Sequence, residues 1–296
     1  MTALATIAIL MPGDMGHAIG RVLHDHGHDV ITCLDGRGDH TRARALRAGF
    51  RDVGSLDAVV GEADLILSIL PPSAALDQAR LVANCMTALG RTPVYADCNA
   101  VSPKTSIAVG EVIAGAGARY IDGGIIGLPP GHGSGPRIYV SGPEHQILSP
   151  LNGKGFEVIG MGPEIGQASA MKMTYAALTK GTWTLHLAIL LTAEQLGVSD
   201  TLIGEFADSQ PAALKAMRDR LPFLPADSAR WVGEMEEIAS TFADAGVTPG
   251  FHDGAAAMFR LLARTPFASE TRDDMDRSRS LEEALAVYRD FLPATT

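Results

Sequence analysis

LATIAILMPGDMGHAIGRVL, residues 4–23, carries the strongest structural signal in this chain. Its first part, residues 4–10, is a short apolar run with β-branched side chains, which is typical of a buried strand. The run passes into a turn at Pro12 and Gly13, and apolar residues then recur at helical spacing. A strand, a glycine-containing turn and a helix in this order predict the first unit of an α/β fold.

The turn matches most of the glycine fingerprint of dinucleotide-binding loops, G-x-G-x-x-G. Gly13 and Gly16 occupy its second and third positions, where the second glycine lets backbone N–H groups approach a pyrophosphate and the third packs helix on strand. Met11 stands at the first position. We therefore predict that NAD(P) binds at this loop, through Pro12, Gly13, Asp14 and Met15.

The residues after the second predicted strand leave the choice between NAD and NADP open. Asp35 ends that strand, where a carboxylate binds the ribose 2′-hydroxyl of NAD. Arg37, with Arg42 nearby, is placed to hold the 2′-phosphate of NADP instead. Asp35 and Arg37 are both predicted cofactor-binding residues, and the sequence favours neither cofactor.

Short apolar runs alternate with helical patterns through the first half of the chain. This alternation is typical of a parallel sheet with helices on both faces, and therefore predicts a Rossmann-type α/β domain. The later predicted strands end near Gly, Pro, Asp or Asn and span residues 29–34, 64–70, 93–98, 118–123 and 137–142.

The pattern changes near residue 163, and helical periodicity fills the rest of the chain. One long helix is predicted over about 166–196, followed by four more helices. Ser280 and Glu283 form a capping-box pattern at the start of the last one. We predict a dinucleotide-binding domain over 1–163 and, joined to it by the long interdomain helix, an all-α substrate and dimerisation domain over 164–296.

Composition narrows the classes of protein that are compatible with the chain. Its 296 residues are 46% hydrophobic and 20% charged, which is typical of a globular protein and not of a disordered one. The net charge of −10 disfavours a nucleic-acid partner. Cysteines are too few for a disulfide framework or a thiolate metal site, so we expect reduced thiols and no metal at Cys33, Cys85 and Cys98.

We expect neither a secretion signal nor a membrane span in this chain. Its N-terminal residues lack a basic region, and the first apolar run leads directly into the glycine turn. The most apolar later stretch, 183–198, is interrupted by His186 and Glu194 and is too short to cross a bilayer. We therefore expect a cytoplasmic protein that does not bind membranes.

Further motifs indicate a family. PGDMG at 12–16 resembles a G-L-G-x-M-G loop, and GHDV at 27–30 resembles a G-H-x-V strand opening. DCNAVSP at 97–103 is similar to a D-x-S-T-x-x-P segment. On these motifs the chain resembles the β-hydroxyacid dehydrogenase superfamily, which includes 3-hydroxyisobutyrate and phosphogluconate dehydrogenases. Its second half resembles a branch with a helical domain of unknown function, through MKM (171–173), TKG (179–181) and EMEEIA (234–239).

The resemblance implies where the nicotinamide end of the cofactor binds. SILPPS at 68–73 is similar to the family loop beside the ribose and nicotinamide, and the segment at 97–103 lies near the same ring in the family. Leu70, Pro71 and Asn99 are therefore implied to be cofactor-binding residues. The alternative for Asn99 is an ordinary turn residue.

The resemblance also implies a catalytic lysine. The family helix carries G-x-G-x-x-x-K-x-x-x-N, and its lysine corresponds to Lys172. The asparagine of that pattern is Ala176 here, and a serine that holds a substrate carboxylate is Ile126. The resemblance therefore supports proton transfer by Lys172 and does not support a small hydroxy-carboxylate substrate.

The residues themselves favour the same helix face. Lys172, Tyr175, Thr179 and Trp183 share one stripe of the predicted helix. A carbonyl that accepts hydride needs a proton on its oxygen, which Lys172 is placed to supply. We expect partial burial and the positive charge of an oxidised nicotinamide to lower the lysine pKa from about 10.4. Tyr175 is the second candidate catalytic proton donor, or else a packing ring.

The predicted substrate pocket is mainly apolar. IIGLPP at 125–130 indicates a substrate with a hydrophobic or aromatic portion, unless these residues only pack the sheet. Lys180 either contacts substrate or packs its stem with a solvated end. The predicted substrate-contacting residues are Ile125, Ile126, Gly127, Thr179 and Lys180.

Together these patterns predict an NAD(P)-dependent oxidoreductase that transfers hydride between nicotinamide and a small-molecule carbonyl or alcohol. One alternative is an imine reductase, although relatives of that kind typically have aspartate or tyrosine in place of the lysine. Another is a non-catalytic NAD(P)-binding redox sensor. The apolar helical half, with Trp231 and Phe259 among its large side chains, predicts a homodimer.

Overall fold

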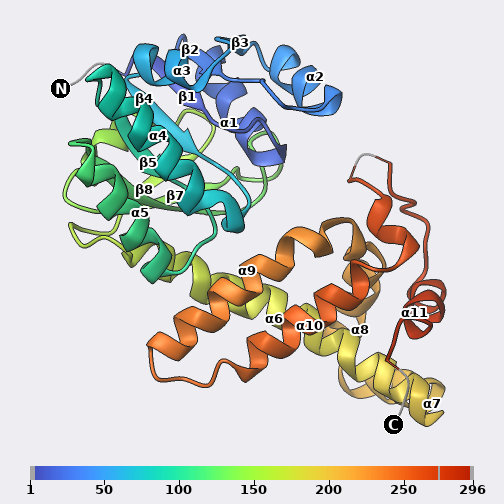
Figure 1. Cartoon of the computed structure of the whole chain (residues 1–296). Helices are drawn as coiled ribbons and strands as arrows, with labels where there is room; N and C mark the ends of the chain where they lie inside the picture. The colour runs from blue at the N-terminus through green and yellow to red at the C-terminus, as the bar shows by residue number, and fades with distance from the viewer. Residues whose placement is uncertain (1–3, 273, 294–296) are drawn as a thin grey trace. The chain divides into compact units, whose positions relative to one another are not determined.

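A computed structural model of the chain describes residues 4–272 and 274–293 (Figure 1). The chain divides into two compact units, Met1–Met173 and Thr174–Thr296. The division falls inside one long helix, α6 (Gln167–Leu196), which begins in the first unit and continues into the second.

The first unit is built on one sheet, whose strands are β1 (Thr6–Ile9), β2 (Asp29–Thr32), β3 (Arg51–Asp52), β4 (Leu65–Ser68), β5 (Val94–Asp97), β6 (Tyr120–Ile126), β7 (Arg137–Ser141) and β8 (Glu157–Gly160). Their order in space is β3-β2-β1-β4-β5-β6-β7-β8. Strands β1 to β6 are parallel, β7 is antiparallel to β6, and β8 is parallel to β7. The Rossmann-type α/β fold predicted from the sequence is confirmed.

Helices cover both faces of this sheet, as alternate residues of β1 show (Figure 1). Ile7 and Ile9 pack in one buried cluster with Ile19 of α1. Ala8 packs in a second cluster with Val82 of α4, on the opposite face. The helices of this unit, with two short 3₁₀ turns, are α1 (Asp14–Asp25), α2 (Asp39–Arg47), α3 (Leu56–Glu62), η1 (Pro72–Ala74), α4 (Ala75–Leu89), α5 (Pro103–Gly115) and η2 (His145–Leu151).

The sheet differs from the predicted one at its edges. The chain passes from β6 to β7 through residues 127–136 without a helix, and such a short connection returns the chain antiparallel. The predicted parallel sheet is confirmed for β1 to β6, whereas β7 and β8 run antiparallel to these strands. The edge strands β3 and β8 were not predicted, because β3 has only two residues and β8 is a half-exposed run without clear alternation.

The second unit is helical, as predicted, but the described residues form one more helix after α6 than expected. These helices are α7 (Ser199–Ser209), α8 (Pro211–Arg220), α9 (Pro225–Asp244), α10 (Gly250–Leu262) and α11 (Leu281–Arg289), with 3₁₀ turns η3 (Leu221–Phe223) and η4 (Pro266–Ser269). The extra helix arises at Pro211, which follows α7 after a single residue. Because proline is tolerated only in the first turn of a helix, it starts α8 instead of continuing α7.

Aromatic side chains pack the centre of the helical unit. Trp231 of α9 lies 5.4 Å from Trp183 of α6 and 5.2 Å from Phe259 of α10, measured between ring centroids. The predicted capping box at the start of α11 is confirmed, because the Ser280 hydroxyl accepts from the Glu283 N–H and the Glu283 carboxylate accepts from the Ser280 N–H.

The start of α6 is attached to the sheet by one carboxylate. Asp122, on β6, is completely buried. It accepts six hydrogen bonds, from the backbone N–H groups of Gly166, Ala168 and Ser169 at 2.9, 3.0 and 3.1 Å and from the hydroxyls of Ser106, Ser141 and Ser169 at 2.8, 2.8 and 2.6 Å. Since helix-initial N–H groups have no partner inside the helix, Asp122 both caps α6 and holds it against β6.

We expect Asp122→Ala to lower the free energy of unfolding by about 3–5 kcal/mol, because several buried donors lose their shared acceptor. Urea denaturation followed by circular dichroism measures this. The control is Ser55→Ala, which removes one exposed cap hydrogen bond to the Ala58 N–H and should cost about 1 kcal/mol. Equal losses in the two variants would contradict the anchoring role of Asp122.

Candidate cofactor and active site

The candidate site lies at the carboxyl ends of the parallel strands. From β1 the chain continues to β2 and β3 on one side of the sheet, and then returns to β4 and β5 on the other side of β1. The strand order therefore reverses its direction between β1 and β4. Ligands of open α/β sheets bind in the crevice beside such a switch point. The predicted cofactor-binding residues follow the ends of β1, β2, β4 and β5, so the topology brings them to this one edge.

The loop after β1 closes tightly on helix α1. The Gly13 N–H donates to the Met11 carbonyl at 2.9 Å, and Gly13 is the N-cap of α1 with no side-chain cap. A Cβ at Gly16 would lie 2.3 Å from the same carbonyl oxygen, so only glycine allows this approach. Pro12 is buried behind the loop. A tight glycine turn with an uncapped helix start is the arrangement that a pyrophosphate requires.

An arginine compensates for an acid at this helix start. Asp14 is the first residue of α1, where its carboxylate would repel a phosphate. Arg44 of α2 pairs with it at 2.6 Å through a guanidinium whose side chain is only 15% exposed. The pair offsets the negative charge of Asp14 and connects α2 to the start of α1. Met15, the next residue of α1, is half-buried.

The residues after β2 present two arginines near the glycine loop. The Arg37 Nη1 lies 3.8 Å from the Met11 sulfur, so the side chain at the missing first glycine contacts Arg37. The Arg42 Nε donates to the Arg37 carbonyl at 2.9 Å. The Arg37 Nε is buried and has no hydrogen-bond partner among the described residues, whereas Asp35 is exposed.

Asn99 joins the ends of β4 and β5. Its Oδ1 accepts a hydrogen bond from the Leu70 N–H, and its Nδ2 donates to the Ser68 hydroxyl at 3.0 Å and to the Asp97 carboxylate. Asn99 is only 2% exposed. It therefore holds the loop that carries Leu70 and Pro71; the Leu70 side chain is half-buried and Pro71 is exposed.

Asp97 is a second buried carboxyl next to the anchor of α6. It pairs in register with Asp122 across β5 and β6 and is 1% exposed. Burial, and then the charge of Asp122, raise the pKa of Asp97 to about 7. Its Oδ2 has no hydrogen-bond partner in the described part of the chain. Asp97 therefore changes its charge near neutral pH.

Two glycines of β6 bring β5 and α6 together at this edge. A Cβ at Gly123 would lie 2.8 Å from the Cys98 sulfur. A Cβ at Gly124 would lie 2.7 Å from the Ala168 carbonyl oxygen and 2.8 Å from the Cβ of Lys172. The stem of Lys172 therefore packs directly on β6, just beyond the ends of β4 and β5, and its side chain is half-buried.

Two of the five residues predicted to contact substrate are interior residues of the sheet. Ile125 and Ile126 are 7% and 3% exposed, and Ile125 belongs to the buried cluster that also contains Ile138. Gly127 has φ +118°, a left-handed conformation that favours glycine, at the end of β6. This burial favours the alternative interpretation, in which the two isoleucines pack the sheet.

The remaining predicted residues lie on α6 within the helical unit. Tyr175 is 44% exposed, and the Thr179 hydroxyl donates to the Ala176 carbonyl at 3.2 Å. Ala176 stands where the family pattern has asparagine and is 1% exposed. Tyr175 is thus accessible in this unit, whereas Thr179 bonds to its own helix.

Lys180 is engaged inside the helical unit. Its ammonium donates to the Glu234 carboxylate at 2.7 Å and lies 5.7 Å from the centroid of the Trp231 ring. Lys180 and Glu234 are 7% and 6% exposed. Because a buried lysine is stable only when it is paired, Glu234 accounts for the position of Lys180, and the lysine does not have the solvated end that the sequence left open.

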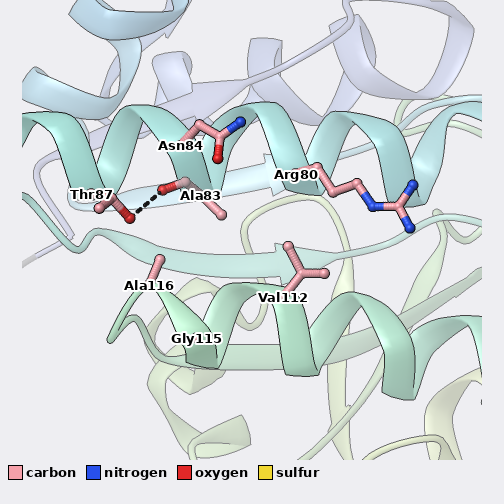
Figure 2. A pocket seen from close by; sticks show the side chains of 7 residues that line it. All are labelled: Arg80, Ala83, Asn84, Thr87, Val112, Gly115 and Ala116. Carbon is pink, nitrogen blue, oxygen red and sulfur yellow. Dashed lines mark hydrogen bonds between the residues drawn. The ribbon is translucent and has the colours of Figure 1, made fainter.

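A surface hollow of about 210 Å³ in the first unit is lined by other residues (Figure 2). It lies between α4 and α5, and includes Arg80, Thr87 and Ala116. In the ranges 4–272 and 274–293, no three His, Cys, Asp or Glu side chains gather as metal ligands. None of the helices described in those ranges is both long and apolar enough to span a bilayer.

Comparison with known families connects this geometry to a dehydrogenase domain. Residues 6–152 match the NAD-binding domain of 6-phosphogluconate dehydrogenase, and residues 193–262 match DUF1932, a domain of unknown function. The chain joins a 6-phosphogluconate dehydrogenase NAD-binding domain to a DUF1932 domain. This NAD-binding domain contains the glycine loop, the Asp97–Asn99 segment and Asp122, so the family and the branch predicted from the motifs are confirmed.

Individual relatives are similar to the chain in sequence or in structure. An uncharacterised 28.5 kDa protein of Methanothermus fervidus is 27% identical over 175 residues, which are 59% of this chain and 66% of that protein, less than two thirds of its length. A conserved hypothetical protein of Sinorhizobium meliloti has a TM-score of 0.67 with 22% identity, over 98% of both chains.

Two solved structures with named activities are also similar to the chain. Mycobacterium tuberculosis 3-hydroxyisobutyrate dehydrogenase has a TM-score of 0.67 with 19% identity, over 97% of this chain and 100% of that one. A Myxococcus stipitatus imine reductase in complex with NADP⁺ has a TM-score of 0.55 with 17% identity, over 87% of this chain and 92% of that one. At these identities the likeness concerns the fold.

Several residues that shape the site were not identified as site residues from the sequence. Asp97 lies in the quoted motif at 97–103 and Asp122 in the predicted strand at 118–123, but their proximity depends on the register of β5 and β6. The signal available in the sequence was that each of two apolar runs, 93–98 and 118–123, contains an aspartate, and that a parallel sheet can place such runs side by side. Arg44 offered no signal, because its pairing with Asp14 requires the docking of α2.

We expect the Asp97 carboxyl to make stability depend on pH. Its pKa is about 7 when folded and about 3.9 when unfolded, so the folded state binds the proton more tightly. Stability should therefore fall between about pH 4 and pH 7, and Asp97→Asn should remove on the order of 3 kcal/mol of this loss. Urea unfolding at about pH 5 and pH 8 measures the change. Asp77→Asn, which replaces an exposed carboxyl of α4, is the control and should leave the free energy of unfolding unchanged at both pH values. Identical pH profiles for Asp97→Asn and wild type would contradict the prediction.

Proposed function

We propose that this protein is an NADP(H)-dependent oxidoreductase that interconverts a carbonyl and an alcohol, with Lys172 as the general acid and base. The observation that carries the proposal is the packing of Lys172 on Gly124, at the edge of the sheet where the glycine loop and the Asn99 segment end. The stem of this half-buried lysine lies at an edge of the sheet of the kind where nicotinamide dinucleotides bind, which supports a role in proton transfer. The named activities of the similar structures belong to those proteins and support the class of reaction only through the fold.

The residues present fit a dinucleotide. A side chain at Gly16 would fill the cradle between Met11 and α1, and the start of α1 has no side-chain cap. Pro12, Gly13, Asp14 and Met15 would hold the pyrophosphate through backbone groups. Leu70, Pro71 and Asn99 lie where the sequence resemblance puts the nicotinamide end. When bound, the cofactor supplies or accepts the hydride.

We infer that NADP(H) is preferred to NAD(H). Arg37 contacts Met11 beside the glycine loop and has a buried Nε without a partner in the described ranges. Arg42 bonds to the Arg37 carbonyl, so two guanidinium groups follow β2. Guanidinium groups suit a ribose 2′-phosphate, and the exposed Asp35 is free to turn into solvent.

Lys172 donates the proton in the reduction direction and accepts it in the oxidation direction. As hydride reaches the carbonyl carbon, the π electrons of the C=O bond move to oxygen, and the Lys172 ammonium gives that oxygen a proton. The neutral amine then recovers a proton from water. In the oxidation direction, the amine takes the hydroxyl proton as the hydride leaves. The packing of the lysine stem on Gly124 limits the positions that the amine can reach.

We expect wild-type protein to oxidise NADPH at least about tenfold faster than NADH with one or more aldehydes, ketones or keto acids. Lys172→Met should lower kcat by about 100- to 10,000-fold, because general acid catalysis is lost. Absorbance of the reduced nicotinamide during turnover measures both. Lys215→Met is the control, since Lys215 is exposed on α8 and pairs with Asp219.

Three results would overturn the proposal. Equal turnover by Lys172→Met and wild type would exclude the lysine as proton donor. Reduction of cyclic imines alone would favour an imine reductase. Tight NADPH binding without turnover across the panel would favour a redox sensor.

We propose that a second copy of the chain covers the exposed face of α6. Leu178, Leu185 and Leu196 are 71%, 58% and 70% exposed, and the first two are seven residues apart. Near the end of the helix, Ile189 and Leu202 help to line an apolar groove of about 370 Å³. The stretch 181–193 contains no Asp, Glu, Lys or Arg, so two copies can pair there without repulsion between like charges.

The cytoplasmic location stays a prediction from the three unpaired cysteines.

We expect wild-type protein to sediment as a dimer at micromolar concentration and Leu185→Glu to sediment as a monomer, because a buried glutamate would lack a partner. Analytical ultracentrifugation gives the masses. Leu46→Glu places the same charge on a leucine that is 76% exposed on α2 and should remain dimeric. A monomeric wild type, or a dimeric Leu185→Glu, would contradict this assembly.

A further inference from the structure

The loop after β4 is held by a buried side chain that makes three of its four possible hydrogen bonds within the chain. Asn99 has one amide acceptor atom and one amide nitrogen with two donor hydrogens. Its Oδ1 is used by the Leu70 N–H, and its Nδ2 is used by Ser68 and Asp97. With 2% exposure, the side chain is also closed to solvent. These contacts argue against the direct cofactor contact that the sequence implied for Asn99.

The same contacts give Asn99 a defined orientation. Asp97 and Ser68 lie on β5 and β4, and both oxygens face the Nδ2. An amide turned by half a rotation would direct its NH₂ group at the Leu70 N–H, which is another donor. The Ser68–Asp97 pair therefore selects the rotamer in which Oδ1 faces Leu70.

The Leu70 N–H is the last backbone donor of this loop before two prolines. Pro71 and Pro72 have no N–H groups, so the segment cannot extend the ladder of β4. Pro71 is exposed, and its carbonyl accepts the Ala74 N–H at 3.0 Å, a bond that stays within the loop and the 3₁₀ turn η1 and does not reach the sheet. The bond to Asn99 is therefore the connection between this loop and the rigid sheet on the β5 side.

We propose that Asn99 is a positioning residue, which Asp97 and Ser68 orient so that it clamps the Leu70 N–H and holds residues 69–72 ready for the nicotinamide half of the cofactor. The proposal rests on the proposed function for the identity of the ligand. The clamp itself is a property of the chain without ligand. Asn99 thus acts on the cofactor through the Leu70 backbone.

The clamp and the arginines act on different parts of the dinucleotide. Arg37 and Arg42 are proposed to bind the 2′-phosphate, which adenosine 2′,5′-bisphosphate retains. The loop at 69–72 is proposed to serve the nicotinamide half, which this fragment lacks. A ligand pair of NADPH and the bisphosphate therefore separates the two effects.

The test uses the full chain and three variants, Asn99→Ala, Arg37→Ala and Thr87→Ala. Thr87→Ala is the matched control, because it removes a side-chain hydrogen bond to a backbone carbonyl, that of Ala83, elsewhere in the same unit (Figure 2). Hydrogen exchange of the Leu70 amide is measured without ligand. Calorimetric titration then gives the dissociation constants for NADPH and for adenosine 2′,5′-bisphosphate.

We expect Asn99→Ala to speed exchange at Leu70 by about tenfold or more and to weaken NADPH by about five- to tenfold, with the bisphosphate unchanged. Arg37→Ala should weaken both ligands and leave exchange at Leu70 as in wild type. Weaker NADPH binding in Asn99→Ala without faster exchange would overturn the clamp and make Asn99 a direct ligand. Exchange and affinity equal to those of Thr87→Ala would also overturn it.

Asn99→Asp keeps the proposal testable if Asn99→Ala does not fold. Aspartate has the same shape and offers Leu70 an oxygen, but it replaces the donor that faces Asp97 with a second carboxyl oxygen. We expect weaker protection of the Leu70 amide, measured as its exchange rate relative to the intrinsic rate at the same pH, and weaker NADPH binding at about pH 8 than at about pH 6, where a shared proton restores the bond. A pH dependence of Leu70 protection no larger than that of wild type would overturn the orienting role of Asp97. Failure of wild type to bind either nicotinamide would overturn the proposed function, and exchange at Leu70 still decides the clamp.

Discussion

The buried carboxylate of Asp122 is the contact on which the candidate site depends. Its six hydrogen bonds attach the first turn of α6 to β6 and β7. Lys172 is less than two turns further along that helix and packs on Gly124. Because α6 and β6, which Asp122 joins, are both regular elements, the stem of Lys172 has little freedom to move relative to the edge of the sheet. One fully bonded carboxylate thus determines where the proposed acid and base lies.

Anchoring an acid at the centre of the sheet affects its neighbours. Asp97 is beside Asp122 in register, and burial together with that charge moves the pKa of Asp97 to near neutrality. The β5 end therefore holds a carboxyl that is partly protonated and still accepts the Asn99 amide. At the β1 end, the pair of Asp14 and Arg44 balances charge in the opposite way, by neutralising an acid at a helix start. The two ends of the site are thus electrostatically different.

The helical unit is stabilised by a different set of contacts. Its centre combines Trp183, Trp231 and Phe259 with the buried pair of Lys180 and Glu234. Breaking such a pair by removing one partner is costly, so the pair stabilises the contact between α6 and α9 within this unit. Leucines on the remaining face of α6 are exposed, which is the basis of the proposed dimer.

Local patterns were sufficient for the α/β domain, the long helix and the capping box at Ser280, because each depends on periodicity, glycine position or a contact within one turn. They also located the glycine loop and Lys172. The reversal of β7, the start of α8 and the pairing of Asp97 with Asp122 depend on which strands and helices become neighbours. Asn99 shows the difference most clearly. Its motif indicates proximity to a cofactor, but its partners Ser68, Leu70 and Asp97 lie 31, 29 and 2 residues away in the chain. Only the folded sheet therefore shows that its amide is already engaged.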